Sequence, residues 1–406
     1  MNQHNNPKIR FKGYDNSLEK KTIGDITTSF SGGTPKSSNK TYYEGNIPFI
    51  RSGEIKSKQT ELFISDEALK NSSAKMVEKG DILYALYGAT SGEVAISQIN
   101  GAINQAILAI KPNSGYSSEF IMNYLKKEKD NILEKYLQGG QGNLSAAIVK
   151  SIELHLPSQE EQSAIGTLFR TLDDLLASYK DNLANYQSLK ANMLSKMFPK
   201  VGQTVPEIRL AGFEVEWEKV KLKDVTESIE YGLNASAKEF DGENKYIRIT
   251  DIDDVSRKFK EDSITSPDIN VSECDNYLLC EKDILFARTG ASVGKTYLYD
   301  IKDGKVYFAG FLIRARIKEK FDSKFIFQNT LTDRFTQYVK VTSQRSGQPG
   351  VNGKEYGEYE LYLPKYEEQQ AIGTYFSNLD NLINSYQEKI SQLETLKKKL
   401  LQDMFI

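Results

Sequence analysis

The segment from Gly290 to Thr296 reads Gly-Ala-Ser-Val-Gly-Lys-Thr and so has the residue types of a phosphate-binding loop. In such a loop, backbone N–H groups hold the phosphates and the lysine neutralises them, but the motif requires four residues between its two glycines. Only three residues separate Gly290 from Gly294, and the related stretch in the first half of the chain has Glu93 where the second has Lys295. We therefore predict that each stretch is a glycine-bearing hairpin turn and that neither is an ATP site.

Other catalytic chemistry has little support in the sequence. Cys274 and Cys280 have no second pair with which to build a zinc site or a disulfide framework, and two thiols suit a reducing cytoplasm. His4 lies in a polar N-terminal tail and His155 beside the end of an expected strand, so neither is a credible base. The glycine pattern of a dinucleotide or methyl-donor pocket is missing, as is the Asn/Asp-Pro-Pro-aromatic run that an amino-methylating site would resemble. We predict no catalytic residue, no metal and no cofactor on this chain.

The strongest pattern in the chain is an internal repeat. Residues 156–198 return at 363–405 with a constant offset of 207, and about 20 of the 43 aligned positions are identical. The repeat continues more faintly through the preceding residues, where Phe49-Ile50-Arg51 corresponds to Tyr246-Ile247-Arg248. Because this period is far too long for a solenoid, the chain must consist of two copies of one large unit.

Each strongly repeated segment is predicted to be a long helix with a coiled-coil seam, which begins after a proline and has two glutamates at the positive end of its dipole. About 40 residues form a rod of about 60 Å, and two such rods in one chain can pair antiparallel. Lys190 and Lys397 interrupt the seams at equivalent positions. A lysine there can fix the register or can snorkel out of a seam end, and the sequence leaves both explanations open. The seam residues are Ile165, Phe169, Leu172, Leu176, Tyr179, Leu183, Tyr186, Met193 and Met197, and in the second copy Ile372, Phe376, Leu379, Ile383, Tyr386, Ile390, Leu393, Leu400 and Met404.

A globular module precedes each predicted rod. In both modules, short apolar runs alternate with Gly, Asn and Ser turns, which predicts mainly strands, for example at residues 82–86, 106–110 and 311–317. Helices are expected near residues 118–137 and 323–339. The predicted fold class is therefore α+β.

Composition sets further bounds. The chain has 406 residues, of which 39% are hydrophobic and 27% charged, as is ordinary for a folded protein. Its net charge is −2, although residues 8–150 carry 19 basic and 15 acidic side chains. This balance permits a local basic groove for nucleic acid but does not demonstrate one. No apolar run approaches the roughly 20 residues of a membrane span, and the N-terminus is unlike a signal peptide. We expect a cytoplasmic protein without membrane contact.

Two sets of motifs resemble a known family. The run from Pro206 to Lys219, Pro-Glu-Ile-Arg-Leu-Ala-Gly-Phe-Glu-Val-Glu-Trp-Glu-Lys, resembles the start of a target recognition domain in the specificity subunits of type I restriction–modification enzymes. The Leu-Pro-x-x-Glu-Glu-Gln-x-Ala-Ile-Gly runs that begin at Leu156 and Leu363 resemble the conserved helices of that family. The resemblance covers nearly the whole chain, in the family's order of domain, helix, domain, helix.

The resemblance implies an architecture and a role. Two target recognition domains, twisted mainly-β sheets with helices, would be joined by two long antiparallel coiled-coil helices with a pseudo-twofold internal repeat. The expected bounds are 1–157 and 199–364 for the domains, and 158–198 and 365–406 for the helices. Each domain would read one part of a split, asymmetric site on double-stranded DNA. The helices would dock two modification (methyltransferase) subunits, and restriction (motor–nuclease) subunits would join them. S-adenosylmethionine, ATP and Mg would be bound by those partner subunits.

Residues that read DNA should lie on loops and carry side chains suited to base edges or phosphates. Glycine-rich loops at residues 139–143 and 347–352 are the preferred candidates, because glycine lets the backbone approach a phosphate closely. An alternative for many of these residues is that they are solvated turn residues. The candidates are Lys36, Tyr42, Arg51, Ser52, Tyr87, Thr90, Ser91, Asn104, Gln105, Gln141 and Asn143 in the first module, and Asn234, Arg248, Thr250, Arg288, Thr289, Ser292, Lys295, Arg345, Gln348 and Asn352 in the second.

Two other classes of function remain as alternatives to a specificity subunit. An active nuclease or methyltransferase lacks a recognisable site. A non-catalytic coiled-coil scaffold without DNA specificity would leave two different modules on matching rods unexplained.

Overall fold

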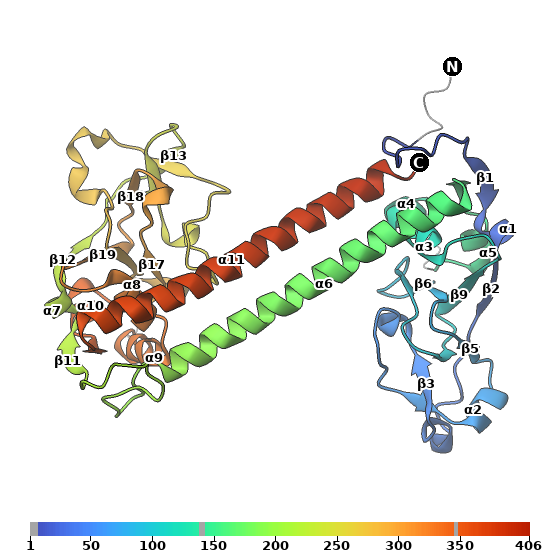
Figure 1. Cartoon of the computed structure of the whole chain (residues 1–406), viewed down its shortest axis with the longest axis horizontal. Helices are drawn as coiled ribbons and strands as arrows, with labels where there is room; N and C mark the ends of the chain where they lie inside the picture. Colours follow the sequence, from blue (N-terminus) through green and yellow to red (C-terminus); the bar gives the residue numbers. More distant parts are fainter. Residues whose placement is uncertain (1–6, 138–142, 345–347) are drawn as a thin grey trace. The chain divides into compact units, whose positions relative to one another are not determined.

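The computed structural model describes residues 7–137, 143–344 and 348–406, which fold into two compact units (Figure 1). Unit 1 comprises residues 1–179 and 389–406, and unit 2 comprises residues 180–388. Two 38-residue helices, α6 (Gln159–Lys196) and α11 (Tyr366–Asp403), each contribute one end to each unit. The predicted α+β class and the two long helices are confirmed.

Unit 1 contains an antiparallel four-stranded sheet in the order β2-β9-β6-β7 and a mixed sheet in the order β4-β3-β8-β5, in which β3 and β8 are parallel. A separate antiparallel ribbon pairs β1 with β10, directly before α6. The strands and helices of the module are β1 (Glu19–Thr22), α1 (Ile23–Ile26), β2 (Thr27–Ser31), β3 (Ile47–Ile50), β4 (Phe63–Ile64), α2 (Asp66–Lys70), β5 (Lys75–Val77), β6 (Ile82–Ala85), β7 (Val94–Ile96), β8 (Gly101–Ile103), β9 (Ile107–Pro112), α3 (Ser118–Lys127), α4 (Lys129–Leu137), α5 (Ala146–Lys150) and β10 (Glu153–Leu156).

Unit 2 repeats this plan. Its four-stranded sheet has the order β12-β19-β16-β17, its parallel pair is β14-β18, and the ribbon β11-β20 precedes α11. The repeat seen in the sequence therefore extends to the four-stranded sheet, the parallel pair and the ribbon, while in unit 2 the strands β13 and β15 form an additional antiparallel pair. The elements of the second module are β11 (Glu218–Lys221), α7 (Leu222–Val225), β12 (Thr226–Tyr231), β13 (Ala237–Glu239), β14 (Lys245–Ile247), β15 (Thr265–Pro267), β16 (Asp283–Ala287), β17 (Thr296–Leu298), β18 (Val306–Phe308), β19 (Leu312–Ile317), α8 (Ser323–Asn329), α9 (Asp333–Thr342), α10 (Gly353–Gly357) and β20 (Glu360–Leu363).

The predicted strands are present as β6, β9 and β19, but the two predicted module helices need correction. Each of them is a pair of helices, α3 with α4 and α8 with α9. In the second module the break arises because the hydroxyl of Thr332 caps a new helix by accepting a hydrogen bond from the N–H of Phe335 (3.4 Å). Amphipathic periodicity continues across such a break, so the pattern alone predicted one helix.

The repeated glutamate at the start of each long helix anchors the N-terminal segment of its module. The Arg10 guanidinium donates two hydrogen bonds to the Glu161 carboxylate, at 3.0 and 2.6 Å. In unit 2, Arg209 binds Glu368 in the same two-pronged way, at 2.9 and 2.7 Å. Both carboxylates are only 1% exposed, so these charges are compensated by their arginines and the helix N-terminus.

The neighbouring glutamine and glycine hold the module's own helix against the rod. The Gln162 side chain donates to the carbonyl of Pro157 (2.9 Å) and accepts from the N–H of Ser117 (3.2 Å), just before α3. Gln369 makes the equivalent two bonds in unit 2. A side chain at Gly166 would collide with the start of α3. The Glu-Gln-x-Ala-Ile-Gly motif is therefore explained by packing.

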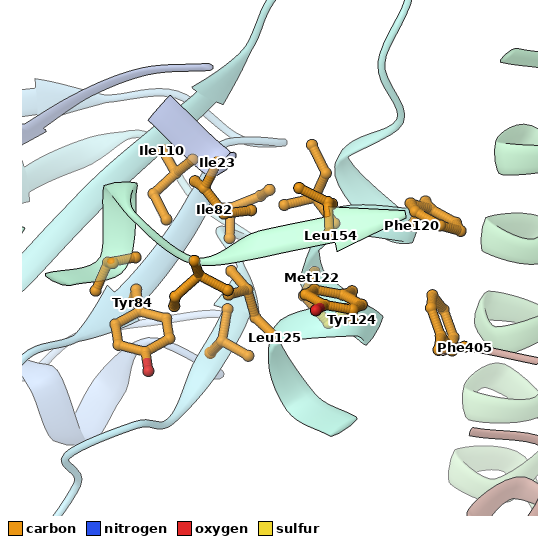
Figure 2. Close-up of a cluster of buried hydrophobic side chains, with 14 of the residues drawn as sticks. Ile23, Ile82, Tyr84, Ile110, Phe120, Met122, Tyr124, Leu125, Leu154 and Phe405 are labelled. Carbon is orange, nitrogen blue, oxygen red and sulfur yellow. The ribbon is translucent and has the colours of Figure 1, made fainter. Parts of the chain in front are cut away.

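A phenylalanine at the end of each long helix completes a core. Phe405 lies 5.0 Å from Phe120 and 5.9 Å from Phe169 between ring centroids, in a cluster that also contains residues of the main sheet (Figure 2). Its repeat equivalent, Phe198, lies 5.9 Å from Phe376 in unit 2. Each unit thus buries the end of one long helix against the beginning of the other, which makes their pairing antiparallel.

The two seam lysines form matching ion pairs. Lys190 lies 2.5 Å from Asp380 in unit 2, and Lys397 pairs with Asp173 in unit 1. The lysine side chains are 16% and 21% exposed, and partners 17 residues apart on each helix satisfy both pairs in one antiparallel register. These contacts support the register explanation over snorkelling.

Phe198→Ala and Phe405→Ala are each expected to destabilise their unit by about 3–5 kcal/mol, because each leaves a cavity in an aromatic cluster. Trp217, the single tryptophan, contacts Phe198 at 6.3 Å and lies 4% exposed in unit 2. Tryptophan fluorescence during denaturation should therefore shift for Phe198→Ala and stay unchanged for Phe405→Ala. Equal shifts for both variants would contradict this assignment of the helix ends.

Candidate nucleic-acid interface

Two hairpin turns occupy the stretches that resemble phosphate-binding loops. Gly88 and Gly92 lie between the antiparallel strands β6 and β7, and Gly290 and Gly294 lie between β16 and β17. All four glycines have positive φ angles, between 74° and 84°, which other residues rarely adopt. The prediction of glycine-bearing hairpins is confirmed.

The residue after each second glycine ties the hairpin to the neighbouring loop through an ion pair of opposite polarity. Lys295 is 8% exposed and pairs with Asp254. Glu93 instead pairs with Lys129 and Lys56, and these hydrogen bonds outweigh burial and lower the pKa of Glu93 to about 2. Lys295, a predicted DNA contact, is thus occupied inside its module, and the same connection is made with exchanged charges in the two modules.

The ends of both glycine-rich loops dock beside these hairpins. Tyr87 forms a β-bridge with Asn143, and Thr289 forms the equivalent bridge with Gly350. The predicted contacts Gln141 and Arg345 lie outside the described residues. The described loop ends therefore meet the hairpin at the same place in each module.

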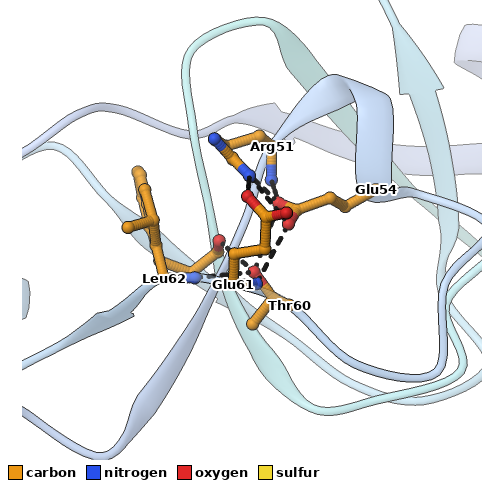
Figure 3. Close-up of polar contacts among 6 residues, drawn as sticks. Arg51, Glu54, Thr60, Glu61 and Leu62 are labelled. Carbon is orange, nitrogen blue, oxygen red and sulfur yellow. Dashed lines mark hydrogen bonds and ion pairs between the residues drawn. The ribbon is translucent and has the colours of Figure 1, made fainter.

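Two predicted arginines hold carboxylates. The Arg51 guanidinium donates two hydrogen bonds of 3.0 Å to Glu54 and one of 2.6 Å to Glu61, and the backbone N–H of Arg51 also binds Glu54 (Figure 3). Arg248 grips Asp251 in the same way, at 2.8 and 2.9 Å. Each pair closes a short 3-10 turn after the first strand of the parallel pair. The side chains of Arg51 and Arg248 remain 41% and 37% exposed. They are therefore accessible at the surface and also stabilise the turn that carries them.

Glu54→Gln is expected to destabilise residues 47–64 by about 1–3 kcal/mol at neutral pH, because it weakens charge-assisted hydrogen bonds. Burial would raise the pKa of Glu54, but hydrogen bonds from Arg51 and two backbone N–H groups lower it from 4.5 to about 2. The depressed pKa means that this stabilisation is complete above pH 4.5 and is lost as the pH falls towards 2. Amide hydrogen exchange of this segment should therefore differ between variant and parent at pH 7 and converge at low pH.

Glu61→Gln is the matched control, because the Glu61 side chain is 81% exposed and surface pairs contribute little. A difference for Glu54→Gln that persists unchanged below pH 2 would show that the effect has another origin.

The other predicted contacts fall into two groups. Some side chains make hydrogen bonds inside their own module: Ser91, Asn104, Gln105, Thr250 and Asn352. Others stand at loop surfaces, exposed or half-exposed: Lys36, Tyr42, Ser52, Thr90, Asn234, Ser292 and Gln348. These residues stay predicted contacts.

Four of the predicted residues converge on one cleft in unit 2. Asn234, Arg248, Thr250 and Arg288 all line a cavity of about 650 Å³. The same cavity is lined by three aromatic residues that are not among the predicted contacts, the buried Tyr246 and the exposed Tyr231 and Phe311. Phe311 was assigned to a strand, although its position directly after Gly310 was a signal for an exposed turn.

Two kinds of feature are absent from the described ranges, residues 7–137, 143–344 and 348–406. No helix there is long and apolar enough to cross a membrane, and no group of three or more His, Cys, Asp or Glu side chains there is arranged to hold a metal ion.

Comparison with known proteins identifies the class of protein that this repeated architecture defines. The family model described as "Type I restriction modification DNA specificity domain" matches twice, over residues 16–211 and 214–395. The chain therefore belongs to the family of type I restriction–modification specificity subunits, whose members are the non-catalytic DNA-recognition component of their complexes.

Relatives and solved structures agree with this membership over most of the chain. The type I restriction enzyme MjaVIII specificity subunit of Methanocaldococcus jannaschii is 23% identical, over 93% of this chain and 90% of its own length. The EcoKI specificity subunit of Escherichia coli K12 is 21% identical, over 94% and 87%. The crystal structure of a type I S subunit from M. genitalium superposes with a TM-score of 0.67 at 16% identity, covering 99% of both chains.

Proposed function

We propose that this chain reads an asymmetric, bipartite site on double-stranded DNA and scaffolds two modification subunits and the restriction subunits of a type I complex. S-adenosylmethionine, ATP and Mg would be bound by those partners, and the complex would work in the cytoplasm. The observation that carries the proposal is one main-sheet topology built twice on two long helices that are nearly half identical in sequence, with different residues on the two sets of loops. Two modules with the same main sheet but different loop residues are suited to reading two different half-sites.

The loops offer suitable chemistry for this role. Amide, hydroxyl and guanidinium groups stand on turns at the glycine hairpins and beside the parallel strands in each module. Such groups make the hydrogen bonds to base edges and phosphates by which proteins read and grip DNA. The hairpin glycines and the described loop ends at Asn143 and Gly350 bring further backbone groups to the same place in each module.

The long helices carry equivalent apolar side chains that the fold leaves exposed. Leu189 on α6 is 37% exposed and its repeat equivalent Leu396 on α11 is 45% exposed. An exposed leucine at the same position of two repeated helices suits two copies of one partner, because equal surfaces bind equal subunits. This supports two modification subunits per chain.

Leu189→Glu and Leu396→Glu are each expected to reduce the number of bound modification subunits from two to one, since a charge on an apolar contact opposes association. Native mass spectrometry of the co-expressed complex measures that number directly. Asn192→Glu, at an exposed polar position of α6, is the matched control and should leave two copies bound. Two copies on both leucine variants would place the partner surface elsewhere.

The function itself is tested by mapping methylated bases across a genome by single-molecule sequencing, with and without the gene for this chain. We expect one new methylated motif with two unlike halves and an unread gap. A salt-dependent shift of duplex DNA by the purified complex should accompany it, because phosphate contacts release counterions. An unchanged methylation map together with no DNA shift would support a scaffold without DNA specificity.

A further inference from the structure

The cleft in unit 2 contains an arginine beside two aromatic rings. The Arg288 guanidinium carbon lies 5.1 Å from the centroid of the Tyr231 ring and 5.8 Å from that of Phe311. The rings belong to strand β12 and to the turn before β19 and are largely outside the core, with Tyr231 45% and Phe311 60% exposed. We call this cluster of one cation and two exposed rings the clamp, and it lies at the surface of the module.

The position of the clamp is set by several independent hydrogen bonds. The backbone N–H of Arg288 donates to the carbonyl of Phe311 (3.1 Å), and its carbonyl accepts from the N–H of Val351 (2.9 Å). The Tyr231 hydroxyl accepts from the N–H of Gly353 (3.0 Å) at the start of α10. The Arg288 backbone and the Tyr231 ring are thus held in place, which reduces the entropy lost when the arginine side chain binds a partner.

Arg288 differs in its bonding from the other arginine of the cleft. Arg248 is bound two-pronged to Asp251, whereas no carboxylate among the described residues pairs with Arg288, and its buried Nε meets no acceptor there. An arginine beside two aromatic rings, with no carboxylate partner among the described residues, can bind a planar acceptor from outside the protein.

The first module has no counterpart of this clamp. The register of β16 on β19 pairs Ala287 with Leu312, and that of β6 on β9 pairs Ala85 with Ile107. Arg288 therefore corresponds to Leu86, which is 5% exposed. By the same registers, Ser31 and Ala106 take the places of Tyr231 and Phe311. Any recognition by the clamp belongs to the second module alone.

We propose, on the basis of the proposed function, that Arg288 reads a guanine in the second half-site, with Tyr231 and Phe311 holding its guanidinium in the reading orientation. Guanine offers the O6 and N7 acceptors in the major groove, and arginine binds this pair with two parallel hydrogen bonds. Thr250 and Asn234 stand in the same cleft and add short polar groups beside the guanine.

The test uses the chain in complex with its modification subunits and duplexes that vary one base pair at a time in the mapped site. Arg288→Gln and Arg288→Lys should lower discrimination for guanine at one position of the second half-site by roughly 5- to 150-fold. Discrimination throughout the first half-site should stay unchanged. Lys302→Gln, which removes an exposed cation from the same module outside the cleft, should change discrimination at no position.

The outcomes distinguish a failure of the proposed function from a failure of guanine reading by Arg288. A parent complex that prefers no sequence contradicts the proposed function itself. A parent that reads sequence, with Arg288 variants that weaken all duplexes equally and reduce the salt slope by about one, makes Arg288 a phosphate contact and overturns guanine reading. Unchanged binding by the Arg288 variants overturns it as well.

Phe311→Leu keeps the test decisive if the arginine variants disturb folding, which Trp217 fluorescence would reveal in the same unit. Removal of one stacking face should weaken discrimination at the same base pair and no other. A Phe311→Leu complex with parental discrimination at every position would count against the clamp.

Discussion

A chain that ends at residue 206, co-expressed with its modification subunit, is expected to pair with a second copy and to methylate an inverted-repeat form of the first half-site. The module of unit 1 needs the end of a long helix to complete its core, and Phe405 provides it in the full chain. A second half-chain would provide Phe198, its repeat equivalent, in the same place. The two copies would then bury one self-complementary interface.

The ion pair between the long helices allows the half-chain dimer to be tested by changing one charge. In such a pair, Lys190 of each copy would face Asp173 of the other, replacing the pair that Lys397 makes in the full chain. Lys190→Glu should weaken the half-chain dimer at least tenfold, because a like-charged contact at a partly buried position costs about 1–3 kcal/mol per pair. Sedimentation equilibrium measures the change.

The double exchange Lys190→Asp with Asp173→Lys restores opposite charges and should recover dimer and methylation. Half-chains that methylate the original asymmetric site, or that dimerise equally well with Lys190→Glu, would show that the repeated helices do not pair in this way.

Four residues inserted into both long helices should lengthen the unread gap of the DNA site by one to two base pairs, while both half-sites remain the same. Four helical residues add about 6 Å, and a base pair rises about 3.4 Å. The insertions belong between Asp173 and Lys190 and between Asp380 and Lys397, so that both ion pairs still form in one register. Methylation mapping gives the gap directly.

An insertion in one helix alone is the control. It leaves unequal spacings between the paired residues, so one ion pair must break, and we expect loss of most methylation with no new defined gap. An unchanged gap in an active enzyme with paired insertions would mean that the joints between modules and helices set the spacing.

The long helices could be predicted from the sequence almost to their ends, because heptad spacing and an ungapped repeat are local signals. The expected segments 158–198 and 365–406 contain α6 and α11. The sequence did not predict that the glutamates of the Glu-Gln motif bind arginines, because the partners of Glu161 and Glu368 lie more than 150 residues away in the chain. Contacts between residues so far apart in the chain depend on the three-dimensional fold, and no periodic pattern in the sequence indicates them.

The candidate interface could be predicted as a set of loops but not as individual contacts. Lysine and arginine residues that suit phosphates also suit internal carboxylates, and Lys295 and Arg51 are used in that second way. For Arg51 a local signal existed, because Glu54 stands three residues on and closes the turn. Phe311 directly precedes the apolar run of β19, so the sequence pattern predicts a strand residue where the structure has an exposed turn. The clamp around Arg288 could therefore be identified only from the structure.

The exchanged ion pairs of the two hairpins bear on how such genes can recombine. A crossover between the codons for Lys56 and Glu93 would join the first half of one module to the second half of the other. One hybrid would place Lys56 opposite Lys295, and the other would place Asp254 opposite Glu93. Either contact between like charges would weaken the hybrid module. A crossover within the helix-coding segments, nearly half identical in protein sequence, leaves each pair whole. Viable recombinants should therefore inherit whole modules, with their junctions in the helices, and new specificities should arise by reassortment.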